Sequence, residues 1–456
     1  MKTTIKSAVV WLFAFFSINI VGQTRPFPQN VTYPYGYKPT TLNSDLAYKE
    51  YNKLMTSFLV ECGGDIRPTA DTEDHTYSES VGYCMLVSAY QGDKTTYDKL
   101  LNFYKSKRSS AENNMMTWKV SCEGIVYTGS SSDADIDVAF SLIVAHEQWR
   151  EQYENNYLEE AKTIIGTLKN SVLTNCAGTY VLKPGYGYGG CNETSISHYT
   201  PAFFRIFAQL TGDNTWSALA DDTYALLIRA TNPTTGLVPD WQNVSGSPAN
   251  SSRSYDYKFD ACRVPWRIAL DYLWNGNLEA QQWCVRITNW ANGIGAANIV
   301  DGYTLHGTPI GSYNNSAFVG AFAVGAMCNS QAVIDTFSTR ITKLNESFYY
   351  AFYLRLIYLH VLTGNFWKPN LSTDVPSVAN PALKIYPNPS SNQISIEGLQ
   401  NFEKLEILGI NGIVLQTEQI HAVDKVTLSI QSLEKGEYLL KVTDKTGASE
   451  CLKFLR

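Results

Sequence analysis

The strongest constraint on the fold is a helical periodicity of apolar residues that recurs over residues 42–363. Apolar side chains return every three or four positions, and polar or glycine-rich stretches separate one such segment from the next. The clearest predicted helices cover residues 83–104, 135–150, 157–173, 201–210, 216–230, 260–273, 278–291, 316–327 and 346–362. Roughly ten or more helices without a convincing set of strands indicate helices stacked in pairs. Periodicity alone is compatible with a closed toroid and with an open solenoid.

The pattern changes near residue 367, where a stretch rich in Pro, Ser, Thr and Asn lacks periodicity, as linkers do. Short alternating segments separated by turn residues follow it, at residues 383–386, 393–396, 404–410, 426–430 and 438–442. They predict a small all-β sandwich of about 75 residues. The predicted division of the chain is a leader at 1–22, a helical domain at 23–366, a linker at 367–382 and the sandwich at 383–456.

The N-terminus has the composition of a signal peptide. Lys2 and Lys6 precede an apolar run over residues 8–18, and small residues follow near Gly22. Such a run is too short to anchor a chain stably in a bilayer. We therefore expect an exported protein without a stable membrane span.

Charge and composition exclude several classes of function. The net charge is -6 and the basic residues form no run, whereas nucleic-acid binding needs clustered Lys and Arg. The six His show no HExxH or paired spacing of a metal hydrolase. The acidic run at 133–137 does not continue as a calcium loop, because Val138 and Val144 stand where such a loop needs Gly and Glu. We expect a monomer without metal, cofactor or nucleic-acid partner.

The nine cysteines are odd in number and show no CxxC pair. Cys176 and Cys191 flank a loop rich in Gly and Tyr, and they are the predicted disulfide. Four others lie in apolar helical stretches and are predicted to be small buried hydrophobic residues: Cys84, Cys262, Cys284 and Cys328.

Three acidic positions could supply the pair of carboxyl groups that hydrolysis of a glycosidic bond requires. Glu79 precedes an apolar helix, Asp133 opens another, and Asp260 stands three residues before Arg263. Each has an alternative structural explanation, because acids stabilise helix N-termini and an Asp pairs with an Arg one helical turn later.

Together these segments resemble glycoside hydrolase family 8. The family signature, two Asp after small residues and then an aliphatic stretch, is similar to residues 131–141 (SSDADIDVAFS). The proton-donor motif resembles residues 78–83 (SESVGY), and the base motif resembles residues 259–265 (FDACRVP). Further family-like stretches are Trp118, 197–201 (SHYTP), 236–241 (GLVPDW) and 271–274 (DYLW).

The resemblance implies an (α/α)6 barrel and hydrolysis with inversion. It implies that Glu79 is the general acid, that Asp260 is the general base acting through water, and that Asp133 binds and distorts the sugar. Inversion places the two working carboxyls roughly 6.5–9.5 Å apart. The residues expected to contact substrate are Arg263, which would also keep Asp260 ionised, and Trp118, Tyr199, Tyr83 and Trp241.

The substrate is predicted less narrowly. The form of the motif around Asp133 resembles the glucanases of the family, so we expect an endo-acting enzyme on a β-1,4-linked glucan. Xylan and chitosan remain alternatives within the family. A non-catalytic glycan-binding protein, a retaining hydrolase and a polysaccharide lyase are alternatives outside it.

The tail resembles the C-terminal sorting domain of type IX secretion substrates. The matching residues are 386–389 (YPNP), 436–438 (GEY) and 453–454 (KF). The resemblance implies a secreted or cell-surface protein whose tail is a partner of the secretion machinery. A carbohydrate-binding module is the alternative, but no Trp follows Trp367 to form a sugar platform.

Overall fold

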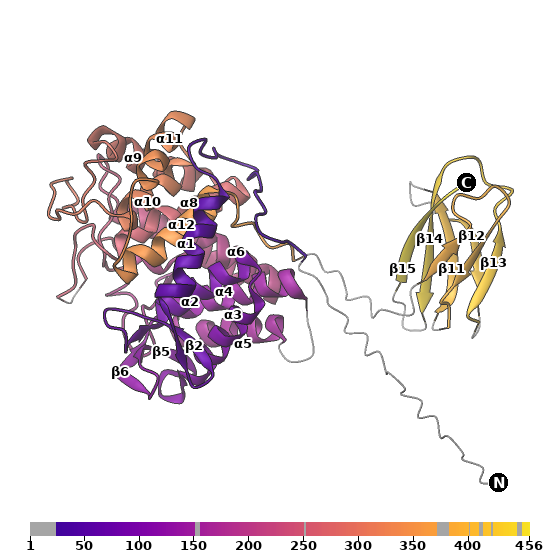
Figure 1. Ribbon diagram of the computed structural model, residues 1–456, viewed down its shortest axis with the longest axis horizontal. Coiled ribbons are helices and arrows are strands. Elements are labelled where there is room, and N and C mark those ends of the chain that lie inside the picture. The colour runs from indigo at the N-terminus through magenta and orange to yellow at the C-terminus, as the bar shows by residue number, and fades with distance from the viewer. Residues whose placement is uncertain are drawn as a thin grey trace, which may run out of the picture. The chain divides into compact units, whose positions relative to one another are not determined.

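The computed structural model describes residues 24–150, 156–249, 252–371, 383–400, 402–409, 414–420, 423–444 and 449–456. The predicted leader and most of the predicted linker lie outside these residues. The chain forms two units, which divide between Asn370 and Leu371 (Figure 1). Trp367, predicted to begin the linker, packs in the first unit, where Tyr90 donates to its carbonyl and the Arg25 guanidinium lies 4.3 Å from its ring centroid.

The first unit contains twelve α-helices among the described residues, and they differ in how much of their surface is buried. Six are buried on nearly every side: α2 (Ser78–Gln91), α4 (Ser132–Trp149), α6 (Pro201–Thr211), α8 (Val264–Asn275), α10 (Ser316–Ala326) and α12 (Tyr349–Leu362). Six bury one face: α1 (Ser44–Ser57), α3 (Lys94–Ser106), α5 (Tyr157–Val172), α7 (Asn214–Ala230), α9 (Leu278–Ile294) and α11 (Gln331–Ile341). Helices that are apolar all round are interior helices, so the two sets form an inner and an outer layer.

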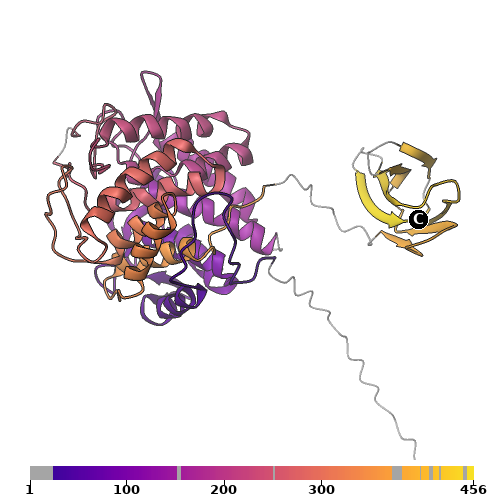
Figure 2. The same ribbon diagram turned by 90° about the horizontal axis from the view of Figure 1, so that it is seen from above.

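The inner helices form a closed ring. Neighbours pack in the order α2–α4, α6–α8, α8–α10, α10–α12 and α12–α2. Phe140 of α4 stacks on Phe203 of α6, with ring centroids 3.6 Å apart, and this contact between α4 and α6 closes the ring. The predicted (α/α)6 barrel is therefore confirmed, and the open solenoid is excluded. Figure 2 shows the packed helices of the first unit from above.

An N-terminal segment closes one end of this barrel. Backbone N–H groups of Thr24, Val31 and Tyr37 donate to Gln148, Gly364 and Met327, at the C-terminal ends of α4, α12 and α10. These carbonyls have no partner inside their own helices, so the segment satisfies them. The N-terminal ends of the inner helices gather at the opposite end of the barrel.

The helical domain also contains strands, although its sequence shows no convincing set of them. Short antiparallel strands lie between the helices: β1 (Leu59–Cys62), β2 (Asp65–Pro68), β3 (Thr76–Tyr77), β4 (Arg108–Ser109), β5 (Met115–Val120), β6 (Ile125–Ser130), β7 (Leu173–Cys176) and β8 (Thr179–Leu182). Two to six residues are too few for alternation to stand out against helical periodicity. The predicted helix at 83–104 is likewise two helices, because Gly92 adopts φ +74° and ends α2.

Two disulfides link these loops. The predicted Cys176–Cys191 bond is confirmed, and a second bond joins Cys62 to Cys122. The four cysteines predicted to be buried and apolar are free and buried.

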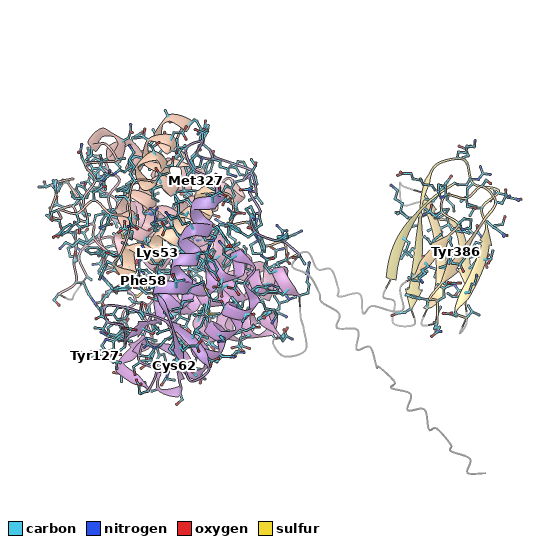
Figure 3. The ribbon with its side chains drawn as sticks, in the orientation of Figure 1. Lys53, Phe58, Cys62, Tyr127, Met327 and Tyr386 are labelled. Carbon is cyan, nitrogen blue, oxygen red and sulfur yellow. A yellow bond between two sulfur atoms is a disulfide. The ribbon has the colours of Figure 1, made fainter. Side chains whose placement is uncertain are left out.

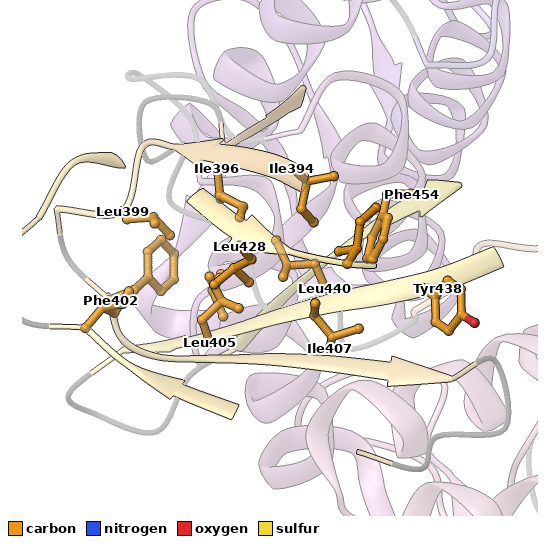
Figure 4. Packing of buried hydrophobic residues seen from close by; sticks show 13 residues of the cluster. Ile394, Ile396, Leu399, Phe402, Leu405, Ile407, Leu428, Tyr438, Leu440 and Phe454 are labelled. Carbon is orange, nitrogen blue, oxygen red and sulfur yellow. The ribbon is translucent and has the colours of Figure 1, made fainter. Parts of the chain in front are cut away.

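The described residues of the second unit form seven strands: β9 (Lys384–Tyr386), β10 (Gln393–Glu397), β11 (Phe402–Gly409), β12 (Val414–Gln419), β13 (Lys425–Ser429), β14 (Glu437–Asp444) and β15 (Ser449–Leu455). They form one sheet in the order β13-β10-β9 and another in the order β12-β11-β14-β15. Alternate side chains from both sheets, among them Ile396, Leu405 and Leu440, share one apolar core (Figure 4). Within the part of the chain described, no helix is long and apolar enough to cross a membrane.

Candidate active site

A cleft of about 520 Å³ lies at the N-terminal ends of the inner helices. Helix N-termini carry partial positive charge, so carboxylates are stabilised there. Glu79 lies in the first turn of α2, Asp133 in the first turn of α4, and Asp260 directly before the short 3-10 helix that leads into α8. All three side chains line the cleft, together with Trp118, Thr128, Gly129, Ser130, Ser131, Tyr188, His198, Trp241, Arg253 and Arg263. Three acids far apart in the sequence thus meet in one cleft.

Arg263 joins these acids. Its Nη1 donates to Glu79 Oε2 at 3.1 Å and to Asp133 Oδ2 at 2.5 Å, and its Nη2 donates to Asp260 Oδ1 at 2.8 Å. Ser197 Oγ accepts a further bond from Nη2 at 3.0 Å. The side chain is 2% exposed, so solvent screens these ion pairs little.

Glu79 has the environment of a proton donor. Burial, together with the negative charges of Asp133 and Asp260, raises the pKa of Glu79 to about 7 against the opposing effect of Arg263. Its side chain remains 22% exposed to the cleft. A carboxyl group with such a pKa is protonated in a substantial fraction near neutral pH and can act as a general acid.

Asp133 has the opposite electrostatic character. Its burial opposes ionisation, but His198 and Arg263 outweigh this effect, and hydrogen bonds from Ser131 Oγ and the Ala134 N–H add to it. The pKa of Asp133 therefore lies well below its usual range. It is a permanently charged group beneath the cleft.

Asp260 is the most accessible of the three acids. Its side chain is 36% exposed, and while Oδ1 binds Arg263, Oδ2 accepts from Trp241 Nε1 at 2.8 Å. Asp260 and Glu79 bind different nitrogens of the same guanidinium. One guanidinium group therefore separates the two carboxyls.

The other two acids of the 133–137 run have structural roles. Asp135 Oδ1 accepts from the Tyr104 hydroxyl and from the Met116 N–H, and Asp137 forms a buried ion pair with Arg267. These contacts tie α4 to α3, β5 and α8. Among the described residues, no group of three or more His, Cys, Asp or Glu could hold a metal ion.

The two predicted Trp contacts lie in the cleft with different surroundings. Trp118 is 37% exposed and stacks parallel to Tyr77, with ring centroids 5.6 Å apart. Trp241 is only 9% exposed, its N–H is bound to Asp260, and the Arg253 guanidinium lies 4.2 Å from its ring centroid. Trp118 can thus present its ring to a sugar, whereas Trp241 mainly holds Asp260.

The predictions for Tyr199 and Tyr83 require correction. Tyr199 is fully buried, and its hydroxyl binds the Leu182 N–H and Thr194 Oγ1 away from the cleft. Tyr83 is 2% exposed, and its hydroxyl lies 3.2 Å from Arg263 Nη1. Neither lines the cleft, so Tyr199 supports the fold and Tyr83 supports Arg263 from behind.

Several residues of the cleft were not among the predicted site residues. His198 comes from the SHYTP stretch, in which the prediction chose Tyr199, and the buried Ser197 of the same stretch binds Arg263 from below the cleft. Tyr188 lines the cleft and lies in the loop that the Cys176–Cys191 bond closes. Its place in that predicted disulfide loop was the only signal in the sequence that could have pointed to it. Nothing in the sequence near Arg253 marks it as a cleft residue.

Comparison with known proteins identifies both units. Residues 37–365 match the family described as "Glycosyl hydrolases family 8", and residues 384–454 match the "Secretion system C-terminal sorting domain". Endoglucanase 2 of Ruminiclostridium josui is 36% identical over 395 residues, which cover 80% of this chain and 83% of that protein. Endoglucanase A of Acetivibrio thermocellus is 34% identical over 404 residues, covering 84% and 83% of the two chains.

Solved structures agree with this. The apo structure of a β-1,3-1,4-glucanase from Paenibacillus sp. X4 has a TM-score of 0.71 at 29% identity, covering 75% of this chain and 99% of that one. The structure of Rex8A from Paenibacillus barcinonensis complexed with xylose has a TM-score of 0.65 and covers 72% and 94%, but at 20% identity it shows the shared fold alone. The chain thus belongs to glycoside hydrolase family 8, as an enzyme of that family with a secretion sorting domain C-terminal to its catalytic barrel in the sequence.

Proposed function

We propose that this enzyme cleaves β-1,4 linkages inside a β-glucan chain, with inversion at the anomeric carbon. The observation that carries the proposal is the bridge formed by Arg263 between Glu79, Asp133 and Asp260 in one cleft. Inverting hydrolysis needs one protonated and one ionised carboxyl on opposite sides of the scissile bond. The different environments of Glu79 and Asp260 suit these two roles.

In the proposed reaction Glu79 donates its proton to the oxygen of the leaving sugar. Its pKa of about 7 keeps the proton available at neutral pH. As the glycosidic bond breaks, Glu79 becomes an anion, and the adjacent Arg263 stabilises that charge.

Asp260 accepts the other proton. A water bound to its exposed carboxylate attacks the anomeric carbon from the face opposite the leaving group, and Asp260 takes a proton from that water. The bonds from Arg263 and Trp241 hold the carboxylate in one orientation. The products are two shorter chains, one of which has the inverted configuration at its new reducing end. Asp260 then releases its proton to solvent, and Glu79 regains a proton from solvent.

Asp133 does not transfer a proton in this mechanism. Its buried negative charge stabilises the positive charge that develops on the sugar ring in the transition state. Its contact with Arg263 also keeps that cation between the acid and the base.

The relatives support a β-glucan as the substrate class. Endoglucanases and a β-1,3-1,4-glucanase are the relatives named above, and the exposed Trp118 offers a ring on which a pyranose can stack. Xylan is the second candidate, because the exo-oligoxylanase Rex8A is 25% identical over 303 residues. Chitosan and a non-catalytic glycan-binding role are further alternatives. The sorting domain marks the protein for export, and we propose that it reaches the surface or the medium after a signal peptide has directed it across the inner membrane.

A substrate panel tests this function. Reducing-sugar release is measured from carboxymethylcellulose, lichenan, xylan and chitosan with the wild type and with Glu79→Gln. We expect the wild type to release sugar fastest from the two glucans and Glu79→Gln to be nearly inactive on all four. Equal inactivity of both proteins would favour the binding role, and fastest release from xylan or chitosan would reassign the substrate.

A further inference from the structure

Asp240, a buried residue outside the proposed reaction, holds the backbone that carries Asp260. Its Oδ1 accepts hydrogen bonds from three backbone N–H groups, those of Lys258 at 3.0 Å, Asp260 at 3.1 Å and Ala261 at 2.7 Å. Asp240 is 4% exposed and does not line the cleft. A carboxylate is buried at a cost unless hydrogen bonds satisfy it, and here all three donors come from the loop of one proposed catalytic residue.

The neighbouring residue completes this arrangement. Trp241 Nε1 donates to Asp260 Oδ2, so two consecutive residues hold the backbone and the carboxylate of Asp260 respectively. Both are themselves anchored, since the N–H of Asp240 donates to Asp256 O and that of Trp241 to Ser254 O. Asp260 precedes a helix of only three residues, so its orientation depends on these outside contacts.

We propose that Asp240 is a positioning residue that sets the place of the Asp260 carboxylate for the attack of water. It acts through the backbone of residues 258–261 and does not contact the substrate. This inference rests on the proposed role of Asp260 as the base. A displacement of about 1 Å in a catalytic group can cost about 10²-fold in rate, which sets the expected effect.

Three substitutions test it. Asp240→Asn keeps a carbonyl oxygen where the three N–H groups converge, Asp240→Ala removes it, and Asp240→Glu keeps the charge but moves the oxygen by one methylene. We expect Asp240→Ala and Asp240→Glu to lower kcat about 10²-fold with KM changed by no more than about twofold, and Asp240→Asn to retain most of kcat. The control is Asp213→Ala, which removes an acceptor of the Thr215 N–H at the start of outer helix α7 and should leave kcat unchanged.

The outcomes distinguish the positioning role of Asp240 from the role of Asp260 as the base. If Asp260→Asn is inactive while Asp240→Ala and Asp240→Glu keep wild-type kcat, the positioning role is wrong and the base assignment stands. If Asp260→Asn itself keeps activity, the base assignment is wrong. Should Asp240→Ala fail to fold, the comparison of Asp240→Glu with Asp240→Asn at equal melting temperature gives the same decision.

A different observation concerns the groove beyond the acid. A second cavity, of about 240 Å³, shares Glu79, Trp118 and Ser131 with the cleft, and a third, of about 530 Å³, shares Tyr349 with the second. The outer cavity, as we call the third, is lined by Lys53, Ser57, Phe58, Val60, Thr69, Ala70, Asp71, Thr72, Glu73, Ser347, Phe348 and Tyr349. Lys53, in α1, and Phe58, the residue directly after α1, line one side of the outer cavity (Figure 3). The second cavity thus shares lining residues both with the cleft and with the outer cavity.

We infer that the outer cavity binds glucose units of the same chain, several positions from the bond that is cut. The inference rests on the proposed function. Phe348 is 55% exposed at the start of α12 and packs edge-on against Tyr349, so it offers an apolar surface among polar neighbours. Asp71, Thr72 and Glu73 supply hydrogen-bond acceptors for sugar hydroxyls.

Chain length provides the test, with soluble cello-oligosaccharides from trimer to octamer as substrates. We expect Phe348→Ala to lower kcat/KM about three- to tenfold on the longest oligosaccharides and to leave the shortest unchanged. The control is Tyr48→Ala, which removes an aromatic ring of similar exposure that packs on Phe27 instead. An effect of Phe348→Ala that is equal at every length, or absent, overturns the outer site, whereas wild-type inactivity on the whole series would contradict the proposed function instead.

Discussion

Arg263 Nη1 lies within hydrogen-bonding distance of both Glu79 Oε2 and Asp133 Oδ2, so one nitrogen serves an acid whose pKa is raised and an acid whose pKa is lowered. The two acids differ because Asp133 also receives bonds from Ser131 and the Ala134 N–H, whereas Glu79 faces two other carboxylates. Arg263 thus lowers the pKa of both acids, and burial together with the two neighbouring carboxylates keeps the pKa of Glu79 raised in spite of it.

Replacing Arg263 with Lys should impair both activity and stability. An ammonium group is a single point charge and cannot bind three carboxylates at once. We expect kcat/KM to fall at least about 10²-fold and the free energy of unfolding to fall by about 3–5 kcal/mol, because buried carboxylates lose their partner. Enzyme assays and denaturant titration measure the two effects. Arg229→Lys, at an exposed Arg that donates to Val244 O, should change neither; a wild-type rate in Arg263→Lys would refute the role given to the guanidinium.

The pH dependence should report Glu79. The acid works only when protonated, so kcat/KM should decline as pH rises above about 7, by tenfold per unit at high pH. A profile that stays flat to pH 9 would show that Glu79 is not the donor or that its environment differs from the one described.

The folding stability should also depend on pH through the ionisation of Glu79, and it should fall as pH rises. Because the folded-state pKa of Glu79 lies above its usual value, the folded protein binds this proton more tightly, and the associated stability is lost as pH rises from about 4.5 through about 7. Glu79→Gln should therefore be more stable than the wild type above pH 7, and the difference should shrink toward pH 4. Thermal melts across this range measure it, and a variant that is less stable at pH 8 would contradict the assignment.

The two Trp residues should have separable kinetic effects. Trp241→Phe removes the N–H that binds Asp260 Oδ2 and should lower kcat about tenfold with little change in KM. Trp118→Ala removes an exposed ring and should raise KM while kcat changes less. Steady-state kinetics on one soluble glucan distinguishes them, and identical effects of the two substitutions would remove the distinction.

The Cys176–Cys191 bond should stabilise the fold and the loop that carries Tyr188. The paired substitution to Ser should lower the free energy of unfolding by about 2–4 kcal/mol and raise KM, because Tyr188 lines the cleft. The matched pair Cys62→Ser and Cys122→Ser should lower stability without the same effect on KM. Denaturant titration and kinetics of the two double variants check both parts.

Much of the fold, and the three acids of the cleft, could be predicted from the sequence. Helical periodicity is strong in segments that bury a face, and the acids lie in local motifs that can be read without knowing which segments meet. Contacts across the barrel could not be read in this way. The SHYTP stretch predicted a Tyr at the site, but only the fold shows that His198 lines the cleft and Ser197 binds Arg263, while Tyr199 lies in the core.

The short strands and the second disulfide could not be predicted for a related reason. Strand β3 is two residues long, and its partner β5 lies some forty positions further along the chain, so no local alternation marks either. Cys62 and Cys122 are 60 residues apart, and their pairing depends on where the barrel brings the two loops. Asp240 lies in the family-like stretch 236–241, but only the fold shows that three N–H groups of the Asp260 loop converge on it.

The most direct test of the account is the configuration of the first product. Proton NMR recorded during the first minutes of hydrolysis of a β-1,4-glucan oligosaccharide follows the anomeric signals before mutarotation mixes them. We predict that the α-anomer appears first, with the β-anomer growing later, and that neither forms with Glu79→Gln or Asp260→Asn. Initial release of the β-anomer would contradict water attack directed by Asp260, and with it the central claim.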